Sequence, residues 1–192
     1  MLVKRNFGLG APGAAGMQQH MTTLPRAALA LLLGFLAALL PANASAAVQV
    51  HFYSREFGNQ FPHAFVLVEG TLAATGKKVT GNYGFTAVNV SPGILLGSVK
   101  GAVQSLKPGY AAKADRKFTV TLDDAGYARL MRKVAEYQAM NQPSYSLDKR
   151  NCVHFIMELA ETAGLKVNRK SKFFRKPRSF LEEVQKLNPG LQ

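Results

Sequence analysis

The chain has 192 residues, of which 24 are lysine or arginine and 11 are aspartate or glutamate, so its formal net charge is +13. Apolar residues make up 47% of the chain, which is enough for a buried core and excludes a mostly disordered protein. The excess of positive charge favours an anionic partner such as a cell-wall polymer, an acidic lipid headgroup or nucleic acid.

The N-terminal part has the order of features found in a cleavable export signal. Arg26 precedes an uncharged apolar run over residues 27–40, and an Ala-Ser-Ala triplet ending at Ala46 follows. The run has 14 residues, fewer than the about 20 that a membrane-spanning helix needs, although an uncleaved anchor is the alternative. We assign residues 1–46 to a leader and signal peptide that is cleaved before Ala47, because small residues mark a signal-peptidase site. The mature protein is then periplasmic or secreted.

The mature part keeps a strong positive charge and contains one cysteine. The first 46 residues hold three cations and no acid, so 21 cationic and 11 acidic residues remain and the net charge is +10. Exported proteins normally pair their cysteines in disulfides, but Cys152 has no partner in the chain. Its thiol is therefore a functional group, an inert buried side chain or half of an intermolecular bridge.

Hydrophobic periodicity predicts strands first and helices later in the mature chain. The segments with strand character are residues 48–53, 63–69, 83–90, 94–103 and 117–122. A loop is expected over 71–81 and a turn at Pro92-Gly93. Apolar stripes of helical period cover about residues 124–141, 152–163 and 177–187. This order indicates an α+β fold in which helices pack on an antiparallel sheet.

Cys152 lies in the first turn of a predicted amphipathic helix, directly after the N-cap Asn151. Free backbone N–H groups and the helix dipole stabilise a thiolate there, so we expect the thiol pKa to lie below its ordinary value of about 8.5. A thiol nucleophile also needs a base within reach. His63, at the head of a strong strand, is the best candidate, and the Cys152 backbone N–H would contribute to an oxyanion hole.

The segment Asn151–Ile156, N-C-V-H-F-I, resembles the N-C-E-H-F-V motif of the lecithin:retinol acyltransferase-like and H-rev107-like proteins. These proteins belong to the circularly permuted branch of the NlpC/P60, papain-like thiol enzymes. Pro62–Val68 is similar to the strand that carries the catalytic histidine in that branch. The resemblance covers about residues 62–165 and implies a permuted papain-like thiol hydrolase domain over 47–165. The motif's glutamate is Val153 in this chain.

The resemblance leaves the third catalytic residue open. The family commonly has a second histidine on the next strand, but no histidine lies between His63 and His154. Asn82 and Tyr83 are the best substitutes, because an asparagine can hold a histidine tautomer, and His51 is a further option as base or orienter. His154 is expected to pack or form hydrogen bonds. The histidines are not spaced as metal ligands, so we expect no metal and no cofactor.

Residues 166–192 are predicted to form a basic segment and a last helix. Seven cations lie within residues 166–178, interleaved with two phenylalanines. Such a segment can bind an anionic polymer or a membrane surface, or it can be merely solvated charge. The candidate substrate-binding residues are Lys170, Lys172, Phe173, Phe174 and Arg175. Because no nucleic-acid-binding motif is present, no sequence-specific nucleic-acid partner is expected.

These patterns predict an exported cysteine-dependent hydrolase that uses a Cys–His pair. Amide bonds of cell-wall peptides suit the export signal and the basic surface, whereas acyl esters of lipids suit the motif resemblance. The alternative is a non-enzymatic basic domain that binds an anionic wall polymer, a membrane or a partner, with a structural Cys152.

The signal assignment predicts that the exported protein begins at Ala47. Intact-mass measurement and N-terminal peptide mapping of the exported material should find this terminus, because signal peptidase cuts after small residues. Recovery of peptides from residues 27–40 in that material would contradict the assignment.

Overall fold

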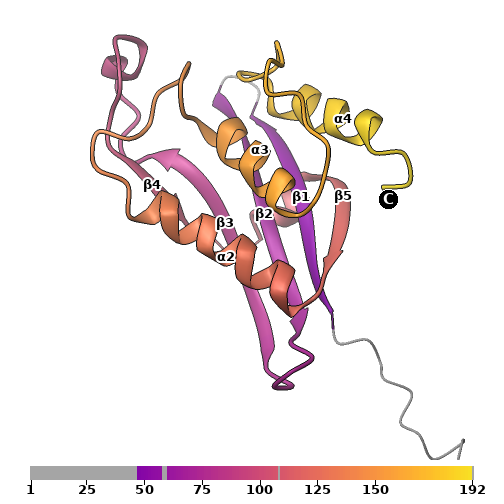
Figure 1. Cartoon of the computed structure of the whole chain (residues 1–192). Helices are drawn as coiled ribbons and strands as arrows, with labels where there is room; N and C mark the ends of the chain where they lie inside the picture. The colour runs from indigo at the N-terminus through magenta and orange to yellow at the C-terminus, as the bar shows by residue number, and fades with distance from the viewer. Residues whose placement is uncertain (1–46, 58–59, 108, 192) are drawn as a thin grey trace, which may run out of the picture. The chain divides into compact units, whose positions relative to one another are not determined.

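The computed structural model describes residues 47–57, 60–107 and 109–191 (Figure 1). The predicted export signal over residues 1–46 lies outside the described residues. In the described part, no helix is both long enough and apolar enough to cross a membrane. The predicted α+β class is confirmed, because an antiparallel sheet of five strands carries three α-helices there.

The sheet is a four-stranded meander to which the last strand is added at the far edge. Its strands are β1 (Val48–Phe57), β2 (Gln60–Thr71), β3 (Lys78–Ala87), β4 (Gly101–Gln104) and β5 (Asp115–Leu122). All neighbours are antiparallel, in the order β4-β3-β2-β1-β5. Residues 105–114, which include the short 3₁₀ helix η2 (Ala111–Lys113), connect the two edges. Tyr110 in this crossover packs edge-on against Phe65 of β2, with ring centroids 5.4 Å apart.

Strand alternation decides which face of the sheet the helices cover. Val50 is paired with Val68 and Phe52 with Val66, and all four side chains are buried. The helices α2 (Asp124–Gln138), α3 (Cys152–Thr162) and α4 (Pro177–Leu187) lie on this face (Figure 1). Because α4 packs against β1, β2 and β5, the predicted basic C-terminal segment is part of the same core.

The predicted strand over residues 94–103 is wrong for most of its length. Pro92–Leu95 forms a 3₁₀ helix, η1, and Gly101–Gln104 alone pairs with β3. Proline favours the start of a helical turn, since its φ is already fixed near the helical value. The predicted loop over 71–81 is also too long, because Lys78–Gly81 pairs with the end of β2. Strand pairing depends on tertiary partners, which a pattern of apolar residues does not reveal.

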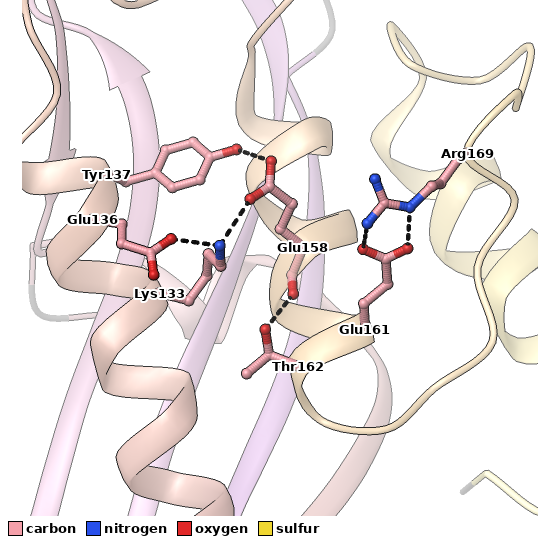
Figure 2. A network of polar contacts seen from close by, with 7 residues as sticks. All are labelled: Lys133, Glu136, Tyr137, Glu158, Glu161, Thr162 and Arg169. Carbon is pink, nitrogen blue, oxygen red and sulfur yellow. Dashed lines mark hydrogen bonds and ion pairs between the residues drawn. The ribbon is translucent and has the colours of Figure 1, made fainter.

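Polar contacts hold α3 on two sides (Figure 2). On the α2 side, the Tyr137 hydroxyl donates to Glu158 over 2.9 Å, and the Lys133 Nζ lies 3.4 Å from the same carboxylate. On the other side, the Arg169 guanidinium donates two hydrogen bonds to the Glu161 carboxylate. The position of α3 is therefore fixed by α2 and by the segment that follows α3.

Asn151 joins three segments at the start of α3. Its Oδ1 accepts from the N–H groups of Val153 at 2.8 Å and His154 at 3.3 Å, which confirms the predicted N-cap. Its Nδ2 donates to the carbonyl oxygens of Leu147 at 2.6 Å and Phe174 at 2.8 Å. The residue is 3% exposed, so water cannot easily replace these partners.

We predict that Asn151→Ala lowers the free energy of unfolding by about 3–7 kcal/mol. Losing the cap costs about 1 kcal/mol, and each buried carbonyl left without a donor adds about 1–3 kcal/mol. The matched control is Asp123→Ala, which removes the N-cap of α2. This variant loses only one side-chain hydrogen bond, from the Gly126 N–H, and should cost about 1 kcal/mol. Urea unfolding of both variants measures the difference, and equal losses would contradict the role assigned to the Asn151 amide.

Candidate functional site

A cavity of about 640 Å³ lies where β2 and β3 separate. The pairing of these strands ends at Val66 and Tyr83, although β3 continues to Ala87 and pairs there with β4. The opening is lined by residues from the start of β2, the end of β3, η1, the crossover and the loop before α3. The lining includes His63, Thr86, Ile94, Tyr110, Tyr145 and Leu147.

The Cys152 thiol lies against the strand edge at this separation. Its sulfur accepts a hydrogen bond from the backbone N–H of Ala64, the residue after His63, and also from N–H groups of the first turn of α3. Cys152 is 5% exposed. The structure therefore brings the start of α3 to the part of β2 that carries His63.

Burial dominates the electrostatics of the thiol. It raises the pKa of Cys152 to about 11, and hydrogen bonds from the N–H groups of Ala64, Val153 and Cys152 counter part of this increase. The expected lowering of the thiol pKa was wrong, because removing the sulfur from water penalises the thiolate more than the helix start stabilises it. At neutral pH the thiol is protonated, so a nucleophilic role requires a base.

The His63 imidazole is held against a glycine of the neighbouring strand. A Cβ added at Gly84 would lie 2.6 Å from the His63 Nε2, so the ring occupies space that any other residue at this position would fill. Burial lowers the pKa of His63 to about 4. The imidazole is thus neutral at physiological pH, which is the form that can accept a proton.

Two tyrosines missed in the sequence share the cavity lining with His63. The Cys152 backbone N–H, which was expected to bind an oxyanion, donates to the Tyr145 hydroxyl oxygen. The pKa of Tyr145 is raised mainly by burial and further by the negative charge of an ionised Cys152. Burial also raises the pKa of Tyr110. The charge and hydrogen bond of Arg55 lower this pKa in part, whereas the charge of an ionised Cys152 raises it further. Both hydroxyls keep their protons at neutral pH. Because these residues lie in irregular segments, no periodicity marks them.

Asn82 and Tyr83 make their contacts away from His63. The register places them opposite residues 66–67, further along β2. The Asn82 Oδ1 accepts from the Leu106 N–H and so fastens the crossover to β3, while Tyr83 packs against the hydrophobic core. These contacts give no support to the predicted role of either residue in orienting His63.

The other two histidines of the described part are engaged elsewhere. The His51 Nδ1 lies 2.8 Å from the Thr119 Oγ1 and its Nε2 lies 3.1 Å from the Glu69 carboxylate, so both ring nitrogens have partners. His154 accepts from the backbone N–H of the N-cap residue and stacks on Phe174 at 4.3 Å between ring centroids. His154 therefore packs and forms hydrogen bonds, as expected from the sequence.

The predicted substrate-binding residues of the basic segment do not line the cavity in the described part of the chain. They are Lys170, Lys172, Phe173, Phe174 and Arg175. Phe173 and Phe174 are partly buried and pack against the core. Arg175 donates to Asp148, and the Lys172 Nζ lies 5.4 Å from the Phe173 ring centroid. The aromatic residues of this segment thus stabilise the fold, and Lys170 and Lys172 remain on the surface.

No three His, Cys, Asp or Glu residues of the described part are grouped so that they could hold a metal ion. The chain matches no protein-family model, no curated protein and no solved structure.

The two shifted pKa values predict how thiol alkylation depends on pH. His63 remains a base down to about pH 4, whereas the thiol ionises by itself near pH 11. If His63 takes the thiol proton, iodoacetamide should alkylate Cys152 on a plateau that begins above about pH 4 and extends through neutral pH. In His63→Ala the plateau should vanish, and the rate should rise toward pH 11.

The rate is measured by intact mass between pH 4.5 and 10, a range bounded by the pKa values of His63 at about 4 and Cys152 at about 11. His51→Ala is the matched control and should retain the plateau, since the His51 nitrogens bond to Thr119 and Glu69. An unchanged profile in His63→Ala would show that His63 is not the base.

Proposed function

We propose that the protein is an exported, cysteine-dependent acyl hydrolase or transferase with a circularly permuted papain-like domain over residues 47–165. The observation that carries the proposal is that the Cys152 sulfur accepts from the N–H of Ala64, the residue after His63, while His63 and Tyr145 line the neighbouring cavity. A thiol nucleophile, a neutral base and protonated donors are the groups that acyl transfer requires. The order of the chain, with the histidine strand before the cysteine helix, supports the permuted arrangement.

In the proposed reaction, the Cys152 sulfur attacks the carbonyl carbon of the substrate while its proton passes to the His63 imidazole. The tetrahedral intermediate then breaks the carbon–oxygen or carbon–nitrogen bond, and His63 returns the proton to the leaving group. Water then attacks the resulting thioester and gives a proton to His63, which passes it to the departing Cys152 sulfur, so that the free acid and the thiol are released. An acceptor other than water gives the transferase reaction.

Tyr145 is proposed as a donor to the oxyanion. Its hydroxyl already accepts from the Cys152 N–H, and its raised pKa keeps the O–H proton in place. An uncharged donor in a buried site stabilises a developing negative charge without prior reorganisation.

Two substrate classes fit this site. The predicted export signal and the positive charge support amide bonds of cell-wall peptides, which carry carboxylates. The cavity lining supports acyl esters of lipids, since it includes the apolar side chains of Val90, Ile94, Leu106 and Leu147 beside Lys107. An apolar wall with one cation suits an acyl chain next to an anionic headgroup.

We predict that Cys152→Ser and His63→Ala each abolish product release from the substrate that the protein accepts. Purified cell-wall sacculi and phosphatidylglycerol vesicles are the two substrates to assay, with released amines and fatty acids as readouts. The double variant should be no slower than either single variant, because the base has nothing to activate without the thiol. Gly84→Ala should also lower the rate, since its Cβ displaces the His63 ring.

The controls separate catalysis from folding. Serine is well tolerated at a helix start, so Cys152→Ser should melt within a few degrees of the parent protein. His154→Ala should instead lower the melting temperature more than the rate, because it loses the stack on Phe174. If parent and variants bind sacculi or vesicles equally and none releases product, a non-enzymatic binding domain replaces the proposal.

A further inference from the structure

The loop between β3 and β4 exposes an unusual concentration of large apolar side chains. Val88 is 37% exposed, Val90 65%, Leu95 71% and Leu96 90%; we call residues 88–96 the apolar tip. Elsewhere in the described residues, Leu187 at 39% is the one further exposed large apolar side chain identified. Single exposed apolar residues are ordinary, whereas a cluster of them marks an interaction surface.

The exposure of the tip follows from its hydrogen bonds. The Val88 N–H donates to the Lys100 carbonyl over 2.8 Å, which closes the base of the loop. Within the loop, the Leu96 N–H donates to the Gly93 carbonyl over 3.0 Å. Ile94 is 6% exposed and lines the cavity, so it holds η1 against the protein while Leu95 and Leu96 face outward. Figure 1 shows the loop between β3 and β4 extending beyond the sheet at the upper left.

The stretch of sequence that contains the tip carries charge of one sign. Residues 70–114 contain five lysines and no aspartate or glutamate. Lys100 is exposed at the base of the tip, and the exposed Lys107 lines the cavity together with Val90 and Ile94. Apolar side chains flanked by lysines match a surface that is apolar inside and negatively charged outside.

We propose that the apolar tip docks on an anionic phospholipid bilayer, with Leu95 and Leu96 in the acyl region and Lys100 and Lys107 at the headgroup phosphates. A projecting loop can enter a fluid layer without a complementary groove. A second copy of this chain would bring a surface of the same positive charge, which opposes association. Docking would place the cavity mouth at the bilayer, because Val90 belongs to both the apolar tip and the cavity lining. The proposal does not depend on the chemistry proposed for Cys152.

A single tryptophan tests the insertion directly, because the chain contains none. Leu96→Trp carries the probe in the tip, and Leu187→Trp carries it on α4 as a matched exposed control. Both are made with Cys152→Ser, so that lipid is not consumed and a failure of the proposed catalysis does not affect the result. Each variant is expressed from the full chain and used as the host processes it, so that both have the same N-terminus.

With phosphatidylglycerol vesicles, emission of the Leu96→Trp protein should shift to shorter wavelength and be quenched by acyl-brominated lipid. The Leu187→Trp protein should show neither effect. Adding Leu95→Ser should raise the vesicle concentration for a half-maximal shift about tenfold, as expected for one leucine that is no longer buried. Adding Lys100→Ala or Lys107→Ala should raise it about fivefold each and weaken its salt dependence.

The control for charge is the double variant Lys77→Ala/Lys78→Ala, which removes two lysines, the first residue of β3 and the one directly before it. This variant should leave the vesicle titration unchanged. Absence of a shift in the Leu96→Trp protein, or an equal shift in the Leu187→Trp protein, would overturn the proposal. An equal response to neutral phosphatidylcholine would overturn the choice of an anionic bilayer. A shift without lipid that grows with protein concentration would assign the tip to a second copy of the chain.

Discussion

The buried amide of Asn151 is the contact on which the site depends. Its oxygen caps α3, and its nitrogen donates to the loop before α3 and to the segment after it. A buried donor or acceptor that loses its partner costs more than the bond itself contributes, so these three segments move little relative to one another. Because Cys152 is the next residue, the same bonds fix its sulfur at the edge of β2. They also explain why Phe174 belongs to the core, since its carbonyl accepts from this amide.

Burial shifts the pKa values of the Cys152 thiol and the His63 imidazole in opposite directions. It raises the pKa of Cys152 and lowers the pKa of His63, so each group is neutral when considered by itself. In the proposed reaction, transfer of the thiol proton to the imidazole creates two opposite charges, and an opposite charge within about 4–6 Å favours both charged forms. The site then depends on the placement of the ring, which Gly84 permits by leaving the space beside Nε2 open.

Local patterns predicted the parts of the site that depend on neighbouring residues. The cap at Asn151, the helix after it, the strand at His63 and the packing role of His154 all follow from short-range signals. The register of β3 and the crossover do not, since tertiary pairing sets them. This is why Asn82 was expected beside His63 although it fastens Leu106, and why Tyr110 and Tyr145 were missed. The thiol pKa was predicted in the wrong direction because the sequence of a helix does not reveal how deeply other elements bury its first turn.

Hydrogen bonds and adjacent residues connect the apolar tip with Cys152. The tip closes on Lys100, and the adjacent Val99 exchanges two backbone hydrogen bonds with Tyr145, at 2.8 Å and 3.0 Å. The Tyr145 hydroxyl in turn accepts from the Cys152 N–H. Ile94 gives a second link, because it anchors η1 and lines the cavity. A force on the tip would therefore act on the residue that contacts the Cys152 backbone, and a partner held at the tip would lie at the wall of the same cavity.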